Sequence, residues 1–135
     1  MPNVTSIIHH VHTIAVVGFS NDAEKPSHYV AEYLHQAGYR IIAVNPRITN
    51  AWGEPGYASL RDIPDQVDLV LVFRRPEFCV GVVQDALAMA HRPMTIWLQS
   101  GITSPDAQQL AEEAGITFIQ NHCLMVEHRR VKSEE

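Results

Sequence analysis

Four short segments of the chain combine glycine, polar and basic residues, and each directly follows a run of apolar residues. These segments are Gly18-Phe19-Ser20, Asn45-Pro46-Arg47, Phe73-Arg74-Arg75-Pro76 and Gln99-Ser100-Gly101. Guanidinium groups bind phosphate through paired hydrogen bonds, and aromatic and guanidinium groups can cover the face of a base. If the apolar runs are parallel strands, ligands bind outside their carboxyl ends, where these segments lie. The chemistry they indicate is the binding of a phosphorylated nucleotide.

The first segment resembles a phosphate-binding turn. Gly18 lets the backbone turn tightly, and the helix expected after it presents free N–H groups and a partial positive charge to an anion. Lys25 and Ser27 add possible donors. The dinucleotide fingerprint G-x-G-x-x-G is absent, because residues 18–27 contain one glycine only. A purely structural turn is therefore an equal alternative for this feature taken alone.

The second and third segments help to distinguish between nucleotides. An NAD site normally places an acidic residue near the end of the second strand, where this chain has Asn45-Pro46-Arg47. An arginine there suits a phosphate on the ribose, as in NADP or in the 3′-phosphorylated adenosine of coenzyme A (CoA). Phe73 with Arg74 and Arg75 can cover an adenine and reach phosphates. The alternatives are a solvated Arg47, a core Phe73 and arginines in surface ion pairs.

The histidines and cysteines do not form a metal-binding pattern. His9, His10 and His12 have no cysteine or carboxylate at ligand spacing, and we expect them at the start of a solvated amphipathic helix. The two cysteines, Cys79 and Cys123, are too few for a disulfide framework or a zinc site. We therefore predict no metal site.

No catalytic group stands out either. The best constellation is His122-Cys123 with Glu127 and His128, but adjacent side chains usually point apart, and nucleophilic pairs are normally assembled from distant segments. An exposed Cys123 near the thiol end of bound CoA would form a mixed disulfide with it under oxidation. The more frequent alternative is a buried cysteine that behaves as a small hydrophobe.

The elements that position these residues alternate between strand and helix. Strands are predicted at 13–17, 40–44, 67–73, 95–98 and 116–119, with helices between them at about 28–37, 76–90 and 104–114. Residues 49–65 predict an excursion with one short helical turn near 60–62. This order predicts an α/β fold, a Rossmann-type doubly wound parallel sheet flanked by helices. We expect a single domain over residues 1–135 with its core at about 13–128, and Leu124-Met125-Val126 as a contact with another subunit.

Composition narrows the class of protein. The 135 residues are 46% hydrophobic and 19% charged, and no apolar run approaches the roughly 20 residues of a membrane span. The net charge of −5 lacks the broad basic surface that attracts nucleic acid. The N-terminus does not have the pattern of a secretory signal. We therefore expect a cytoplasmic protein that binds neither nucleic acid nor membrane.

Seven segments together resemble the family of stand-alone CoA-binding domain proteins, which are similar in fold to the CoA-binding domain of the succinyl-CoA synthetase alpha subunit. They are Ile14-Ala15-Val16-Val17-Gly18, Lys25-Pro26-Ser27-His28-Tyr29-Val30, Gly38-Tyr39-Arg40, Val44-Asn45-Pro46-Arg47, Val72-Phe73-Arg74-Arg75-Pro76, Trp97-Leu98-Gln99-Ser100-Gly101-Ile102 and Cys123-Leu124-Met125-Val126-Glu127-His128. The resemblance implies CoA as the cofactor. The binding residues we predict from it and from the segments above are Gly18, Phe19, Ser20, Lys25, Ser27, Asn45, Pro46, Arg47, Val72, Phe73, Arg74, Arg75 and Gln99.

The expected function is therefore the binding of CoA or an acyl-CoA by a sensor, carrier or regulator that is not an enzyme and acts through an unidentified protein partner. The synthetases that share this domain carry their phosphorylated histidine and nucleotide-binding parts in additional domains, for which 135 residues have no room. The alternatives are an NAD(P)-binding or acyl-CoA-processing enzyme and an interaction protein with a vestigial nucleotide site.

Overall fold

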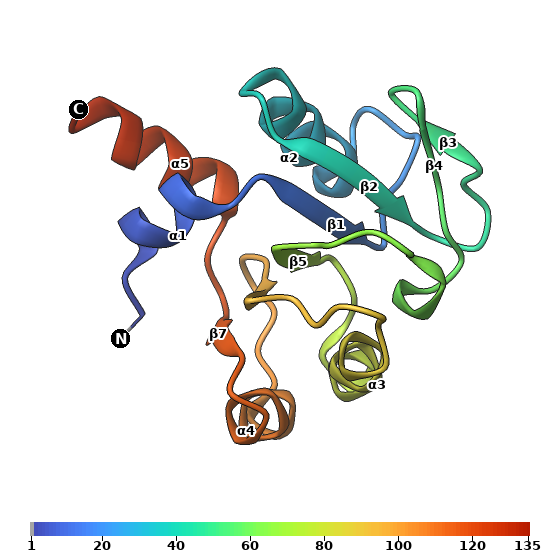
Figure 1. The fold of residues 1–135 in the computed structure, drawn as a ribbon. Coiled ribbons are helices and arrows are strands. Elements are labelled where there is room, and N and C mark those ends of the chain that lie inside the picture. The colour runs from blue at the N-terminus through green and yellow to red at the C-terminus, as the bar shows by residue number, and fades with distance from the viewer. Residues whose placement is uncertain (1) are drawn as a thin grey trace.

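A five-stranded parallel sheet forms the centre of the computed structural model, which describes residues 2–135 (Figure 1). Its strands are β1 (Thr13–Val17), β2 (Arg40–Val44), β5 (Leu69–Val72), β6 (Thr95–Leu98) and β7 (Thr117–Ile119), in the order β2-β1-β5-β6-β7. Continuous runs of valine, isoleucine and leucine form these strands because both faces of the sheet are covered. The doubly wound α/β fold predicted from the sequence is thereby confirmed.

Five helices cover the two faces of the sheet. They are α1 (Val4–His10), α2 (Pro26–Gln36), α3 (Pro76–Leu87), α4 (Pro105–Glu113) and α5 (Leu124–Ser133). Helices α3 and α4 lie on one face, and α1, α2 and α5 lie on the other (Figure 1). Three helices begin with proline, whose fixed φ suits the first helical position and whose missing N–H is not needed there.

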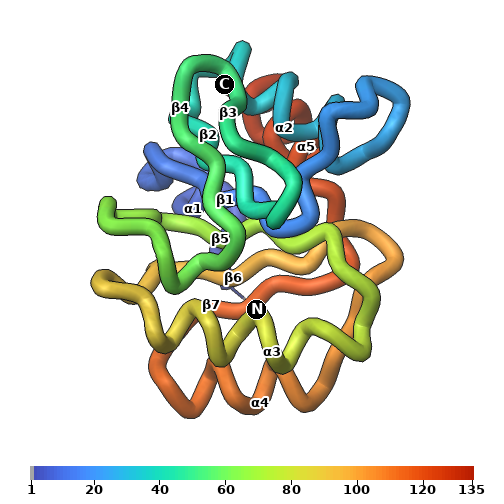
Figure 2. The backbone as a smooth tube through the Cα atoms, turned by 90° about the vertical axis from the view of Figure 1, so that its right-hand side faces the viewer, coloured from blue at the N-terminus to red at the C-terminus, as the bar shows by residue number. Residues whose placement is uncertain are grey.

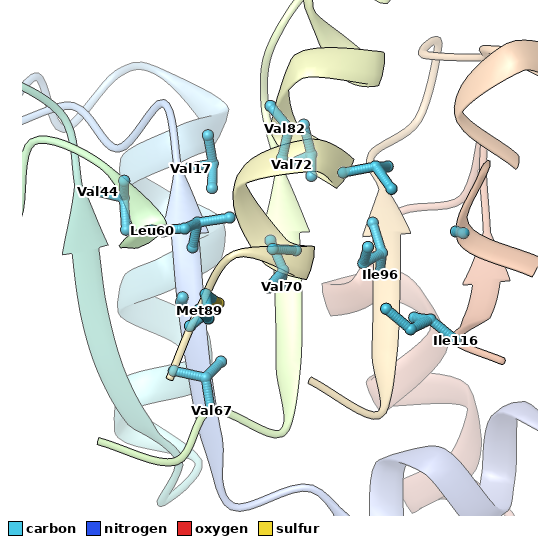
Figure 3. Packing of buried hydrophobic residues seen from close by; sticks show 14 of the residues in the cluster. Val17, Val44, Leu60, Val67, Val70, Val72, Val82, Met89, Ile96 and Ile116 are labelled. Atoms are coloured by element: carbon cyan, nitrogen blue, oxygen red, sulfur yellow. The ribbon is translucent and has the colours of Figure 1, made fainter. Parts of the chain in front are cut away.

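The core consists of two layers separated by the sheet. Figure 3 shows Val70 and Val72 of β5 among the side chains that pack beneath α3. The intervening Leu71 points to the opposite face, where it packs with fully buried Trp97 and with Leu34 of α2. This alternation follows from the two-residue period of a strand. Both faces of the sheet are therefore rigidly packed, and the strand ends hold fixed positions.

Two segments differ from the prediction. The strand predicted at 67–73 spans only 69–72, and the chain bends at Asp68, whose carboxylate accepts the backbone N–H groups of His12 and Thr13, both at 2.9 Å. The excursion contains the predicted helical turn, η1 (Leu60–Asp62), but also a hairpin of β3 (Asn50–Ala51) and β4 (Glu54–Pro55) that the sequence reading missed. A strand of two residues is too short to show in the sequence the alternation of apolar and polar residues that predicts a strand.

Helix α5 was not predicted, and it places one of the three residues suggested as a subunit contact, Leu124, inside this same chain. Leu124 and Val131 are buried in the core of this same chain. The Tyr33 hydroxyl of α2 lies 2.7 Å from Nδ1 of the buried His128 and ties α5 to α2. Only Val126 of the three suggested residues is largely exposed.

The strand order reverses between β1 and β5. From β1 the chain crosses to β2 on one side, and from β5 it continues through β6 and β7 on the other side. Such a reversal opens a crevice at the carboxyl ends of the strands, which is where doubly wound sheets bind ligands. Figure 2 views the molecule from the side toward which the arrowheads of β1 and β2 point in Figure 1.

Within the described residues, no helix has the length and hydropathy needed to cross a membrane.

Candidate functional site

A cavity of about 350 Å³ opens at the point where the strand order reverses. We call it the switch-point cavity. The ends of β1, β2 and β5 form its floor, and the segment before η1 and one face of α3 form its walls. Its lining residues are Val17, Gly18, Val44, Asn45, Pro46, Ala58, Ser59, Leu60, Phe73, Arg74, Val82 and Asp85. Five of the predicted binding residues therefore meet here: Gly18, Asn45, Pro46, Phe73 and Arg74.

Gly18 is the residue that lets the loops after β1 and β5 approach each other. Its φ of +87° is a conformation that residues with a side chain rarely adopt, and a Cβ at this position would lie 2.8 Å from the Phe73 carbonyl oxygen. The Gly18 N–H donates to the Val44 carbonyl at 3.0 Å, and the Phe73 N–H donates to the Val17 carbonyl at 2.9 Å. The turn is thus closed by backbone contacts that only glycine permits.

Asn45 shapes the cavity through contacts within the protein. Its Nδ2 donates to the Phe19 carbonyl at 2.8 Å, and its Oδ1 accepts the Arg47 N–H at 2.9 Å. These bonds hold the loop after β2 against the loop after β1. The adjacent Pro46 lines the cavity, whereas the Arg47 side chain lies exposed outside it. No acidic residue follows β2 directly, which matches the sequence argument against NAD.

The structure separates the two arginines that follow β5. Arg74 lines the switch-point cavity, with its guanidinium carbon 4.5 Å from the centre of the Phe78 ring. The Arg75 side chain is 81% exposed, and its Nε lies 3.9 Å from Glu77. Among the described residues Arg74 forms no ion pair with a carboxylate. It is therefore the arginine that is free to bind an anion in this cavity.

Two predicted binding residues, Phe19 and Val72, have completely buried side chains. Phe19 packs against the rings of His28 and Trp52, at centroid distances of 5.6 and 5.5 Å. Val72 lies fully inside the core layer beneath α3. Only the backbone of these two residues can contact a ligand. Sequence reasoning placed them at the site because they stand next to Ser20 and Phe73, without showing which way each side chain points.

The loop after β1 and the start of α2 form the third part of the site. The Ser20 hydroxyl accepts the Asp22 N–H at 3.0 Å, and the Ser20 carbonyl lies 2.8 Å from the ring Nδ1 of His28. Lys25 stands exposed immediately before α2, and Ser27 lies nearly buried in its first turn. These residues are held near the amino end of α2, where backbone N–H groups and the helix dipole favour an anion.

A second cavity, of about 390 Å³, lies on the opposite side of Phe73. We call it the apolar cavity. The beginnings of α2 and α5 and the loop after β6 enclose it, and none of its lining residues carries a formal charge. They are Pro26, Tyr29, Val30, Phe73, Gln99, Ser100, Ile102, Cys123, Met125 and Val126. Phe73 appears in the lining of both cavities, so the two cavities are adjacent at this residue.

Gln99 is the predicted binding residue that belongs to the apolar cavity. Its Oε1 accepts the Leu124 N–H at 2.9 Å and so positions the start of α5. Sequence reasoning missed Tyr29, Met125 and Val126 on the same cavity wall. The wall was hidden because α5 was not predicted, and without that helix the three residues cannot be placed together.

Sequence reasoning also missed one wall of the switch-point cavity. Residues 58–60 and Asp85 line it, and the Asp85 carboxylate accepts a hydrogen bond from Nε of Arg61 at 2.7 Å. Asp85 could have been found from the helical period that places it one turn after Val82, which also lines the cavity. Residues 58–60 gave no comparable signal, because they lie in the irregular segment after β4.

Three reactive side chains outside the cavities are either bonded within the protein or buried. His128 is bonded to Tyr33, and burial lowers its pKa. Glu127 pairs with Arg130 at 3.1 Å. Burial raises the pKa of the Cys79 thiol, which has no exposed surface. Within residues 2–135, no three histidine, cysteine or acidic side chains are grouped to hold a metal ion.

The site therefore offers contacts for binding: an unpaired guanidinium, a helix start, and two cavities of different polarity. Comparison with known proteins points the same way. The sequence model of the CoA binding domain matches residues 12–129. The uncharacterized protein YneT of Bacillus subtilis is 37% identical over 129 residues, which cover 96% of this chain and 94% of YneT.

Solved structures show the same fold across nearly the whole chain. A Thermus thermophilus protein, cell-free ID.343, is 40% identical with a TM-score of 0.90, covering 96% of this chain and 99% of that one. A hypothetical protein from Pyrococcus horikoshii is 31% identical with a TM-score of 0.89, covering 96% and 89%. The fold also recurs, at 23% identity and a TM-score of 0.69, in a quarter of a dinucleotide-forming acetyl-coenzyme A synthetase from Ca. Korarchaeum cryptofilum. The chain belongs to the CoA-binding domain family.

Proposed function

We propose that this protein binds CoA across the carboxyl edge of its sheet and acts as a sensor, carrier or regulator without chemistry of its own. The adenosine end lies in the switch-point cavity, the pyrophosphate lies near the amino end of α2, and the pantetheine arm passes Phe73. Family membership supports CoA as the ligand. The size of the switch-point cavity also falls within the range typical of ligand sites.

The observation that carries this proposal is the unpaired charge of Arg74. Three other arginines are paired with carboxylates of the protein: Arg40 binds Glu54 and Asp65, Arg61 binds Asp85, and Arg130 binds Glu127 and Glu134. Arg74 lines a cavity and has no such partner among the described residues. In a chain of net charge −5, a guanidinium left without a carboxylate beside a cavity fits an anionic ligand.

Two further cations extend this positive region. Lys25, before α2, and Arg47, after β2, are exposed and form no ion pair within residues 2–135. CoA carries a pyrophosphate and a 3′-phosphate on its ribose, so its adenosine end presents several anionic groups to such a region. We assign Lys25 to the pyrophosphate and Arg47 to the ribose phosphate.

The proposal of a non-catalytic role rests on what surrounds the site. Neither cavity is lined by a histidine or a lysine, and the one acidic lining residue, Asp85, is held by Arg61. General acid–base catalysis needs a titrating group within hydrogen-bond reach of the substrate. The lining of these cavities supports binding, and its only other titrating groups besides Arg74 are the Cys123 thiol and the Tyr29 hydroxyl.

Calorimetric titration of the purified protein tests the proposal. The ligands are CoA, dephospho-CoA, NAD and NADP, used at matched concentrations. We expect CoA to bind at about micromolar strength, dephospho-CoA to bind more weakly because it lacks the 3′-phosphate, and NAD not to bind. Binding of NAD or NADP in preference to CoA would replace the proposed ligand. No heat with any of the four would leave the fold in place and overturn the function.

A further inference from the structure

The apolar cavity has features that the adenosine and phosphate groups of CoA do not use. Four large apolar side chains are exposed in the described chain, and two of them, Tyr29 at 43% and Val126 at 52%, line this one cavity. They lie on different helices, at the starts of α2 and α5, and face a common space. Covering apolar surface of this kind is favourable, at about 25 cal/mol for each Å² removed from water.

Gln99 adds a polar group to this apolar space. Its side chain is 5% exposed, and its Oε1 is bonded to the Leu124 N–H. Because that partner is a donor, the other end of the amide is the Nε2 group. Nε2 has no hydrogen-bond partner in the part of the chain that the structure describes. An N–H donor that has no protein acceptor, still reaches solvent and lies in the wall of an apolar cavity fits a ligand carbonyl oxygen.

Continuity with the CoA site indicates which ligand brings that carbonyl. The two cavities share Phe73, so a ligand that fills the switch-point cavity and continues past this ring enters the apolar cavity. The group at that end of CoA is the thiol, which forms thioesters with acyl groups. A thioester joins a carbonyl oxygen to a carbon chain, which are the two kinds of group that this cavity suits.

We propose that the apolar cavity holds the uncharged acyl group of a short-chain CoA thioester, with Gln99 Nε2 donating to the thioester carbonyl and Val126 covering the chain. This inference rests on the proposed CoA function. Because no charged side chain lines the cavity, it offers no partner to a carboxylate on the acyl group. Burying an unpaired carboxylate is costly, so the cavity selects neutral acyl groups against acidic ones of the same length.

The test uses a matched pair of ligands. Butyryl-CoA and succinyl-CoA have acyl chains of the same number of carbons, but succinyl ends in a carboxylate. In calorimetric titrations beside CoA itself, we expect butyryl-CoA to bind about tenfold more tightly than CoA, from the added buried carbons. Succinyl-CoA is expected to bind no better than CoA.

A matched pair of variants locates the effect. Val126→Asp introduces a negative charge into the cavity wall at a position that is 52% exposed. Met94→Asp introduces the same charge at a position that is similarly exposed, 51%, but does not line this cavity. We expect Val126→Asp to abolish the advantage of butyryl-CoA over CoA, measured as the ratio of the two affinities within that variant. Met94→Asp is expected to bind all three ligands as the unaltered protein does.

The possible failures are distinguishable. Equal affinity for CoA, butyryl-CoA and succinyl-CoA would overturn the acyl site and leave CoA binding in place. Absence of binding by all three would overturn both proposals. A dimer that Val126→Asp dissociates, without any change in thioester affinity, would assign this face to a second copy of the chain and would also overturn the acyl site.

Discussion

The two cavities on either side of Phe73 lie at the same edge of one sheet but differ in the chemistry of their walls. The switch-point cavity contains Arg74 and lies beside exposed cations, whereas the apolar cavity has no charged lining residue and two exposed apolar side chains. Strand ends form both floors. The difference comes from the covering elements, which are α3 and the segment before η1 on one side and the starts of α2 and α5 on the other. The carboxyl edge of one sheet thus suits a ligand with one anionic end and one apolar end.

The largest expected effect comes from distorting the turn at Gly18, which lines the switch-point cavity and lies against the backbone of Phe73. Gly18→Ala places a Cβ 2.8 Å from the Phe73 carbonyl and adds strain at φ +87°. We expect it to abolish measurable CoA binding and to lower the midpoint of thermal unfolding. Gly38→Ala is the control, because Gly38 has φ +105° with nothing within 4 Å. That variant is expected to lose about 1–2 kcal/mol of stability and to bind CoA normally. Similar CoA affinity in the two variants would contradict the role given to Gly18.

The next effect separates the two arginines after β5. Arg74→Ala is expected to weaken CoA binding about ten- to a hundredfold, since hydrogen bonds to charged groups contribute about 1.5–3 kcal/mol each. Arg75→Ala is expected to change the affinity less than threefold, because a highly exposed side chain contributes little. Titration calorimetry at two salt concentrations measures both. If Arg75→Ala lowered the affinity for CoA more than Arg74→Ala does, the switch-point cavity would not be the phosphate site.

A smaller, local effect tests where the thiol end of CoA lies. Incubation with CoA disulfide is expected to modify Cys123, whose thiolate attacks one sulfur to form a protein–CoA disulfide and release one CoA thiolate. Cys79 is expected to stay unmodified, because it is fully buried and burial raises its pKa. Intact-mass measurement detects the adduct, and Cys123→Ser is the control. An adduct on Cys79, or none at all, would place the thiol end elsewhere.

The smallest effect concerns the helix that carries the wall of the apolar cavity. Burial lowers the pKa of His128 below its ordinary value of 6.5, with Lys132 acting in the same direction and Glu135 against it. The unfolded chain therefore protonates His128 more readily than the folded chain does. The stability that neutral His128 contributes is fully present above the ordinary pKa of 6.5, and it is lost as the pH falls through the lower pKa of the folded state. Urea unfolding between about pH 7.5 and about pH 5 is expected to show a steeper loss than in His128→Gln, which does not titrate. Parallel curves would exclude this role.

Sequence reasoning found the sheet because each strand is an apolar run between turn residues, a pattern that burial on both faces imposes. It also found the edge where Gly18, Pro46 and Arg74 meet, since parallel strands bring their carboxyl ends together. It could not separate Arg74 from Arg75, because which of two adjacent side chains enters a cavity depends on the exact direction of the helix that follows. The burial of Phe19 depends on Trp52, in a hairpin too short to predict.

The apolar cavity was the part least accessible from sequence. Its wall depends on α5. In the sequence, the basic residues Arg129, Arg130 and Lys132 of this helix have the pattern of a solvated tail. In the structure, Leu124 and Val131 of the same helix are buried in the core. The role of Gln99 in holding that helix joins residues 25 positions apart, which no local pattern shows.

Amide NMR with the two halves of CoA tests most directly the claim that one ligand spans both cavities. Adenosine 3′,5′-bisphosphate is expected to shift the backbone signals of Gly18, Asn45 and Arg74, and pantetheine is expected to shift those of Gln99 and Cys123. Intact CoA is expected to shift both sets at once. If both halves shift the same signals, or if CoA leaves either set unchanged, the two cavities do not form one CoA site.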